Sequence, residues 1–205
     1  MTTTILLVRH GQTESNITGY FMGWSDEDMS DLGYAQAQKL ASRLAHLPVA
    51  SVYTSPLKRA HNTALILAKA HNVKPKISDD LIEIQVGDWQ GLHRDEISQR
   101  WPELWQQSRT DPSEISLPNG ESFQQVTDRA IRAFEMAVAE NEDKHALMVT
   151  HDVVIRLLVA HVLGTSNSIY RRFEVANASL SIMRVTDGTA RLITLNDTSH
   201  LENQI

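Results

Sequence analysis

The sequence predicts an α/β fold, a three-layer αβα sandwich with a mainly parallel six-stranded sheet and helices on both faces. Three observations predict it. Short apolar runs alternate along the chain with amphipathic helical stretches. The run at residues 5–8 is continuously apolar, which is typical of a strand that is buried on both faces. A chain of 205 residues, of which 41% are hydrophobic and 21% charged, has the size and composition of one soluble domain.

The expected elements follow from local signals. Strands are expected at residues 5–8, 49–54, 73–77, 146–150, 179–185 and 191–196. Helices are expected from the N-cap Ser30 to about residue 46, from Ser55 and Pro56 onward, over 123–140 and over 152–163. Residues 93–108 predict one or two short helices interrupted at Pro102. We expect one domain over residues 1–205, in which the irregular stretch of about 84–121 forms a small cap or lid.

Composition excludes several classes of function. The net charge is −6 and the basic residues form no run, so a nucleic-acid partner is not expected. The absence of cysteine excludes disulfides, thiolate metal sites and cysteine nucleophiles. No apolar run approaches about 18 residues and no signal peptide is present, so we expect no membrane contact and a cytoplasmic location.

Polar side chains follow three of the predicted strands. Arg9 and His10 come after the first strand, Ser55 and Arg59 after the second, and His151 after the fourth. In open α/β sheets the carboxyl ends of the strands face the crevice in which ligands bind. Two arginines there could grip phosphate oxygens, and two histidines could divide the roles of nucleophile and charge stabiliser. An arginine and a histidine after one strand also occur in ordinary surface turns. The interpretation as an anion site therefore depends on the polar residues at all three strand ends.

With these motifs in order, the chain resembles the histidine phosphatase superfamily, also called phosphoglycerate-mutase-like, over nearly its whole length. The resemblance rests on L-V-R-H-G-Q-T-E-S-N at 7–16, S-D-L-G-Y-A-Q-A at 30–37, Y-T-S-P-L-K-R-A-H-N-T-A at 53–64, L-I-E-I-Q-V-G-D-W-Q-G-L at 81–92, N-G-E-S at 119–122 and V-T-H at 149–151.

The resemblance implies a metal-independent phosphatase without a cofactor, a phosphomonoester hydrolase that acts on a small phosphorylated metabolite. His10 would be the nucleophile that becomes phosphohistidine, and Glu83 the general acid and later the general base. The phosphoryl oxygens would be held by Arg9, Arg59 and His151, with Asn16 as a further contact. We expect His151 to be protonated, so that it stabilises charge in the transition state.

The resemblance leaves alternatives open. A cofactor-dependent phosphoglycerate mutase would carry extra basic residues, but residues 85–121 contain only Arg94, Arg100 and Arg109, with no adjacent pair. The same stretch is rich in tryptophan, which suits either a less polar leaving group or packing of the cap. A non-catalytic phosphate-binding module would lack at least one of the five core groups, and all five are present. The phosphatase is therefore favoured.

Asp152 departs from the family pattern, in which a small residue commonly follows the second histidine. Its carboxylate either tunes His151 or narrows the leaving-group side of the pocket, or the residue only begins the next helix, where an acid is favoured. The sequence does not decide the identity of the substrate: sugar phosphates, phosphoglycerates, phosphoserine and ribazole phosphate all remain candidates. A homodimer contact through the closing strands and residues 166–173 also stays open.

Overall fold

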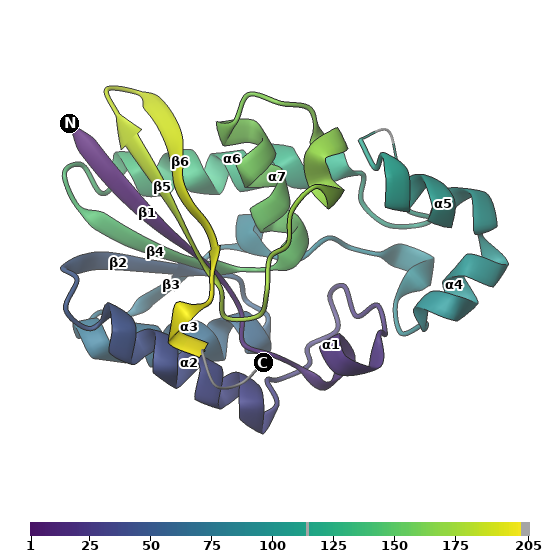
Figure 1. Cartoon of the computed structure of the whole chain (residues 1–205), viewed down its shortest axis with the longest axis horizontal. Coiled ribbons are helices and arrows are strands. Elements are labelled where there is room, and N and C mark those ends of the chain that lie inside the picture. The colour runs from purple at the N-terminus through teal and green to yellow at the C-terminus, as the bar shows by residue number, and fades with distance from the viewer. Residues whose placement is uncertain (114, 202–205) are drawn as a thin grey trace.

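The computed structural model describes residues 1–113 and 115–201, and its strands form one sheet in the order β3-β2-β4-β1-β5-β6 (Figure 1). Neighbours among β1 to β4 pair in parallel, whereas β5 pairs antiparallel with both β1 and β6. The expected six-stranded, mainly parallel sheet is confirmed. The strands are β1 (Thr2–Arg9), β2 (Val49–Thr54), β3 (Pro75–Ile77), β4 (His145–Thr150), β5 (Leu180–Thr186) and β6 (Thr189–Asp197).

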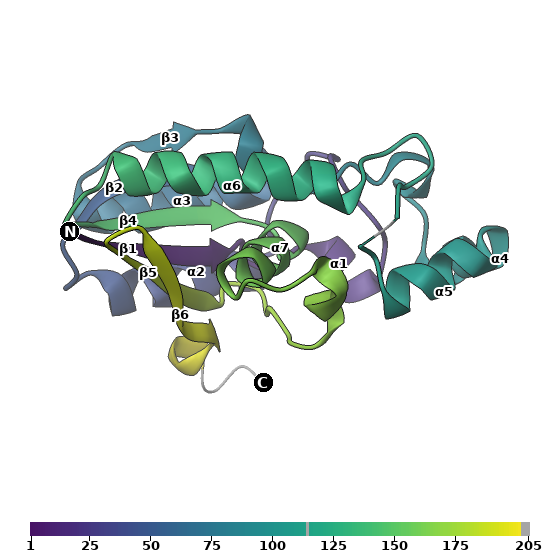
Figure 2. The ribbon, with the colours of Figure 1, turned by 90° about the horizontal axis from the view of Figure 1, so that it is seen from above.

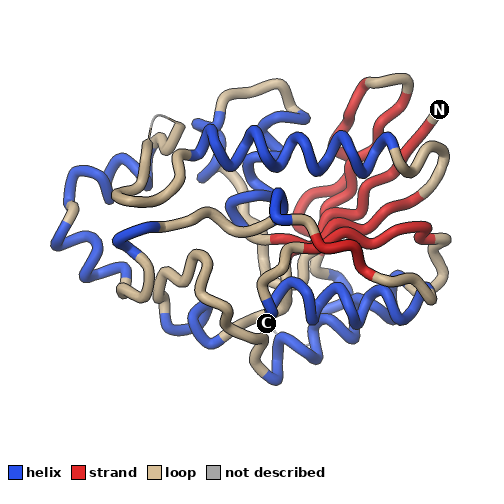
Figure 3. Tube along the Cα trace, turned by 180° about the vertical axis from the view of Figure 1, so that it is seen from behind, coloured by secondary structure: helices blue, strands red, loops and turns tan. Residues whose placement is uncertain are grey.

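Helices cover both faces of the sheet, as a sheet of parallel strands requires. Figure 3 shows α2 and α3 on one side of the strands and α6 on the other, where α7 packs beside it. The helices are α1 (Glu14–Thr18), α2 (Asp31–Leu44), α3 (Lys58–His71), α4 (Arg94–Arg100), α5 (Pro102–Thr110), α6 (Phe123–Ala139) and α7 (Asp152–Val162). Short 3₁₀ turns are η1 (Asp79–Leu81), η2 (Gly87–Trp89), η3 (Asn167–Arg171) and η4 (Ser199–Leu201).

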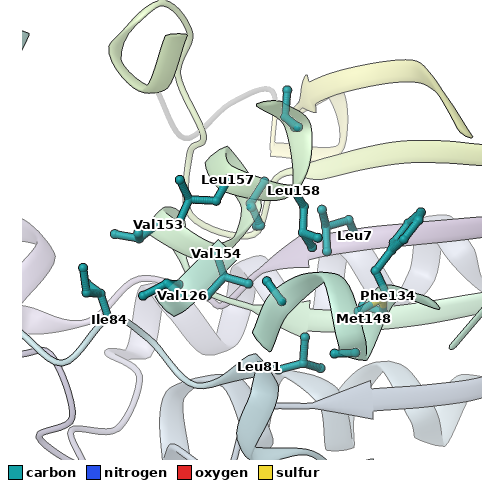
Figure 4. Packing of buried hydrophobic residues seen from close by; sticks show 14 of the residues in the cluster. Leu7, Leu81, Ile84, Val126, Phe134, Met148, Val153, Val154, Leu157 and Leu158 are labelled. Atoms are coloured by element: carbon teal, nitrogen blue, oxygen red, sulfur yellow. The ribbon is translucent and has the colours of Figure 1, made fainter. Parts of the chain in front are cut away.

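The side chains of β1 point alternately into two hydrophobic clusters, one on each face of the sheet. Ile5 and Leu7 belong to the cluster shared with α6 and α7, part of which is shown in Figure 4. Leu6 and Val8 belong to the cluster under α2 and α3. All four side chains are buried, so β1 is a fixed central support for the residues that follow it.

Two local predictions differ from the structure. The helix expected from Ser55 and Pro56 begins instead at Lys58, with Leu57 as an N-cap that makes no side-chain bond. The short helix α1 was not expected; it is set up by a capping box in which Thr13 and Asn16 satisfy each other's backbone N–H groups.

The segment predicted as a cap holds α4 and α5. These helices lie beyond the carboxyl ends of the strands, at a distance from the sheet (Figure 2). It is joined to the loop before α2 by aromatic contacts of Phe21 with Trp89 and Trp105. Trp89 is 2% exposed, so this tryptophan serves packing. Residue 114 of the predicted cap, and residues 202–205 of the expected domain, lie outside the described residues. A lid function for this segment stays a prediction.

In the part of the chain that the structure describes, no helix has the length and apolar character to cross a membrane.

Candidate active site

The ends of β1, β2 and β4 lie side by side, and the predicted site residues follow them. Arg9, the last residue of β1, is the register partner of Thr150, the last residue of β4. Beyond them, the backbone N–H of His10 donates to the carbonyl oxygen of Thr150 at 3.0 Å. Ser55 likewise donates from its backbone to β4, at 3.2 Å. The sheet therefore brings together side chains that are far apart in sequence, among them His10 and His151.

His10 is buried and held as a neutral nucleophile. Its Nδ1 atom lies 2.7 Å from the carbonyl oxygen of Gly11, which can only accept, so Nδ1 carries the ring proton. The lone pair is then on Nε2. Burial lowers the pKa of His10 well below its usual value, and the charges of Arg59 and Arg9 lower it further. The imidazole is therefore unprotonated near neutral pH, as attack on phosphorus requires.

The chain can pass from His10 into the next loop only because Gly11 has no side chain. A Cβ atom at Gly11 would lie 2.4 Å from the carbonyl oxygen of Gly33 and 2.6 Å from the sulfur of Met29. This close approach of α2 explains the glycine and holds the carbonyl that orients His10.

Two arginines stand next to His10, and backbone carbonyls fix the guanidinium of each. Arg59, in the first turn of α3, donates to the carbonyl oxygens of Ser25 and Gly23, both at 2.8 Å. Arg9 donates from Nη1 to the carbonyl oxygen of Val175 at 2.6 Å. The Nε atom of Arg9 is buried without a partner among the described residues. These cations are thus preorganised, and Arg9 keeps a donor that an anion can use.

His151 lies behind His10, with ring centroids 5.1 Å apart, and is fully buried. Its Nε2 atom is 2.8 Å from the hydroxyl oxygen of Ser55, and its Nδ1 atom has no partner among the described residues. Burial lowers the pKa of His151 well below its usual value, and the charge of Arg59 lowers it further. In the ligand-free pocket this buried imidazole beside an arginine is neutral, and protonation of His151 in the transition state stays a prediction.

Glu83 lies in the loop after η1, and several contacts fix its backbone. The indole N–H of Trp24 donates to the Glu83 carbonyl oxygen at 2.6 Å, and Arg129 donates to it at 3.0 Å. The carboxylate accepts the backbone N–H of Ile84 at 2.9 Å. Burial raises the pKa of the Glu83 carboxyl, and the nearby charge of Asp152 raises it further. A carboxyl of this kind can hold a proton for a leaving group.

Asn16 is fixed at the end of the capping box that forms α1. Its Oδ1 atom accepts from the backbone N–H of Thr13 at 3.1 Å and from the side-chain amide of Asn177 at 2.8 Å. Asn177 also donates to the carbonyl oxygen of His10 at 3.2 Å. Asn16 is therefore linked to the backbone of the nucleophile.

Asp152 both begins a helix and lies at the cavity. As the first residue of α7 it begins the helix, as expected, but its carboxylate also lines the cavity. Both carboxylate oxygens accept from Arg156 Nε at 2.9 Å, and one lies 3.8 Å from Arg9. Its charge raises the pKa of Glu83.

A cavity of about 330 Å³ joins these groups. Of the six predicted site residues, five line it: Arg9, His10, Asn16, Arg59 and Glu83. His151 lies behind this lining. Trp105 lines the cavity too, together with the arginines Arg94, Arg109 and Arg171. Among the described residues, no three histidine, aspartate or glutamate side chains gather as a metal site would require.

The family follows from comparison with known proteins. The model of the histidine phosphatase superfamily (branch 1) matches residues 5–198. The chain belongs to this family. The expected resemblance is therefore confirmed, and with it the fold class.

Relatives of the chain include phosphatases of two kinds. The chain is 34% identical over 205 residues to a metal-independent phosphoserine phosphatase of Arabidopsis thaliana, covering 98% of this chain and 84% of the relative. It is 32% identical to an adenosylcobalamin/alpha-ribazole phosphatase of Salmonella typhimurium, covering 93% of this chain and 94% of the relative. The solved structure of Bacillus stearothermophilus YhfR superposes with a TM-score of 0.94 at 32% identity, covering 98% of this chain and 100% of that one.

Proposed function

We propose that the chain hydrolyses a phosphomonoester of a small metabolite through a phosphohistidine intermediate on His10. One observation carries the proposal. The neutral imidazole of His10 has its proton fixed on Nδ1 by the Gly11 carbonyl, while Arg9 and Arg59 stand next to it in the same cavity. This combines a prepared nucleophile with a site for the anionic group that it attacks.

In the first half-reaction, Nε2 of His10 attacks phosphorus and the bond from phosphorus to the ester oxygen breaks. Glu83 gives its proton to the departing oxygen, so the product leaves as an alcohol. Arg9 and Arg59 stabilise the charge on the phosphoryl oxygens. His151 is assigned as a neutral donor through Nδ1, and Asn16 as a further contact.

In the second half-reaction, the Glu83 carboxylate takes a proton from water as the water oxygen attacks phosphorus. The bond from nitrogen to phosphorus breaks, inorganic phosphate leaves, and His10 and Glu83 return to their starting protonation states. One carboxyl thus serves as acid and then as base. Its raised pKa supports both roles, because the acid stays protonated to higher pH and its carboxylate is a stronger base.

The substrate belongs to a narrow chemical group. By their names, one relative is a phosphoserine phosphatase and the other an adenosylcobalamin/alpha-ribazole phosphatase. Phosphoserine and alpha-ribazole phosphate are small phosphomonoesters, and we place the substrate of this chain among such compounds. A homodimer and a cytoplasmic location stay predictions.

Phosphoglycerate isomerisation is the second candidate. The presence of Arg94 and Arg109 in the cavity supports it, because a phosphoglycerate carries a carboxylate that arginine binds well. The two functions differ in whether water or the product alcohol takes the phosphoryl group from His10. An assay of 3-phosphoglycerate that records both free phosphate and 2-phosphoglycerate separates them.

The His10→Ala variant tests the proposal. The wild-type protein should form an acid-labile, base-stable phosphoenzyme and release phosphate, and His10→Ala should do neither. His46→Ala is the matched control, because His46 is an exposed histidine outside the cavity. Turnover that persists in His10→Ala would contradict the assignment.

A further inference from the structure

Three arginines line the same cavity as His10 but take no part in the proposed phosphoryl transfer. Arg94 begins α4, Arg109 is near the end of α5 and Arg171 is the last residue of η3. All three are exposed, whereas His10 and Arg59 are buried. The three arginines therefore line the solvent-facing part of the cavity.

In residues 1–113 and 115–201, this group of cations has few acidic neighbours. Within the described residues, Arg109 and Arg171 have no acidic side chain within 4.0 Å, and Arg94 has only the exposed Asp95 at 3.9 Å. Neighbouring arginines differ: Arg129 and Arg156 each form an ion pair with a carboxylate, at 3.0 Å and 2.9 Å. Unpaired arginines in a concave site are available to an anionic ligand.

Two of the three arginines are positioned by their neighbours. The Arg171 guanidinium lies 4.9 Å from the ring centroid of Tyr170, and its Nε donates to the carbonyl oxygen of Ser108 at 3.5 Å. The Arg109 guanidinium lies 5.6 Å from the ring centroid of Trp105. Stacking on aromatic rings holds a guanidinium while leaving N–H groups free to donate.

The charge balance of the cavity points to the kind of ligand. Of the described residues, five arginines and two acids line the cavity, in a chain whose net charge is −6. Of the acids, Asp152 is bound to Arg156, and Glu83 has a raised pKa. A phosphoryl dianion balances Arg9 and Arg59. Among the described residues, the other three arginines then have only the exposed Asp95, 3.9 Å from Arg94, as a nearby counter-charge.

We propose that Arg94, Arg109 and Arg171 form an anion subsite that binds a second anionic group, a carboxylate or a second phosphate, on the leaving-group side of the substrate. The inference rests on the proposed function, because phosphoryl transfer to His10 decides which end of the substrate faces the subsite. It narrows the substrate to phosphomonoesters with a second negative charge and disfavours neutral leaving groups.

Pairs of substrates that differ in one anionic group test the subsite. Phosphoserine and phosphoethanolamine differ only in a carboxylate, as do 3-phosphoglycerate and ethylene glycol phosphate. For the phosphate arm, 1,3-propanediol bisphosphate is compared with 3-hydroxypropyl phosphate. The wild-type protein should prefer the more anionic member of at least one pair by tenfold or more in kcat/KM, mainly through KM. Equal values within every pair would overturn the proposal.

The Arg109→Gln/Arg171→Gln double variant assigns that preference to these residues. It should lose at least tenfold in kcat/KM toward the preferred substrate and stay within about twofold of wild type toward phosphoethanolamine and p-nitrophenyl phosphate. Arg172→Gln is the matched control, since Arg172 is exposed and adjacent in sequence but does not line the cavity. An equal loss toward all substrates would also overturn the proposal.

If the wild-type protein turns over none of these substrates, the subsite can still be tested by measuring their binding to the His10→Ala protein. Titration calorimetry should give a Kd at least tenfold lower for the more anionic member of the preferred pair. The difference should shrink in the double variant and in 0.5 M salt. Binding preference without turnover supports the subsite but refutes the phosphatase proposal. Turnover of p-nitrophenyl phosphate without any preference refutes only the subsite.

Discussion

The hydroxyl oxygen of Ser55 lies 2.8 Å from Nε2 of His151, and both side chains are fully buried. The same oxygen accepts the backbone N–H of Leu57 at 3.3 Å. Because a buried hydroxyl hydrogen needs an acceptor and the ring nitrogen supplies one, the proton of neutral His151 is on Nδ1. Ser55 therefore prepares Nδ1, which has no partner among the described residues, to donate to a bound anion.

Replacing Ser55 by alanine should remove the hydrogen bond that keeps the His151 proton on Nδ1. We expect Ser55→Ala to lower kcat by about tenfold to a hundredfold, because an unsatisfied buried polar group costs about 1–3 kcal/mol. Nitrogen-15 shifts of His151 should show a proton on Nδ1 in the wild type and a mixture of tautomers in the variant. Thr54→Val is the control, since the Thr54 hydroxyl is buried nearby but bonds only a backbone carbonyl. A wild-type His151 protonated on Nε2 would refute the argument.

Removing the proton donor should affect poor leaving groups most. We expect Glu83→Gln to lower kcat/KM for an alkyl phosphate by about 10²–10⁴, the usual contribution of general acid catalysis. The loss for p-nitrophenyl phosphate should be much smaller, because that leaving group needs little protonation. Steady-state rates for both substrates check this, with the exposed Glu135→Gln as control. Equal losses for the two substrates would count against an acid role.

The pH dependence of the first half-reaction should report the charge of Asp152. Burial raises the pKa of Glu83, and of the charges that face it Asp152 raises the pKa while Arg59 and Arg9 lower it. A general acid works only when protonated, so the rate falls as pH rises through this pKa. Asp152→Asn removes the raising charge, so the descending limb of kcat/KM for an alkyl phosphate should move to lower pH. Asp128→Asn, an exposed change on α6, should leave the limb in place; an unmoved limb in Asp152→Asn would refute the coupling.

A chelator should not reduce the activity. Arg9 and Arg59, fixed by backbone carbonyls, can supply the positive charge that phosphoryl transfer needs. Protein dialysed against excess EDTA should therefore hydrolyse p-nitrophenyl phosphate at the untreated rate, with and without added Mg²⁺. Activity that disappears on chelation and returns with Mg²⁺ would contradict this site.

The sequence predicted best what depends on local patterns. Apolar runs and strand ends were sufficient for the sheet and for the convergence of His10, Arg59 and His151. Glu83 was different: only the family resemblance singled it out, since an acid in a turn is unremarkable by itself. Arg171 was missed because it reaches the cavity from η3, far from the other cavity residues in sequence, through contacts with Tyr170 and Ser108. No local spacing signals such a contact.

The protonation state of His151 is another property that the sequence alone does not predict. Its charge state depends on full burial and on the distance to Arg59, which are properties of the folded chain. Ser55 was interpreted as a helix cap because Ser-Pro is a common helix start. The position of β4 gives its hydroxyl a histidine partner instead.

Gly33 of α2 packs against the loop after His10. Substituting this glycine tests whether that packing holds the site in place. A Cβ atom at Gly33 would lie 2.1 Å from the carbonyl oxygen and 2.8 Å from the nitrogen of Gln12, both backbone atoms that cannot yield without moving the loop. Alanine in an exposed helix would stabilise by about 1 kcal/mol relative to glycine. Here we expect Gly33→Ala to lower the free energy of unfolding by about 1–3 kcal/mol, as overpacking does, and to lower kcat because the shifted loop carries the Gly11 carbonyl that orients His10. Urea unfolding and phosphatase assays check both effects, with Gln38→Ala on the exposed face of α2 as control. Unchanged stability and turnover in Gly33→Ala would mean that this loop can move without disturbing the nucleophile.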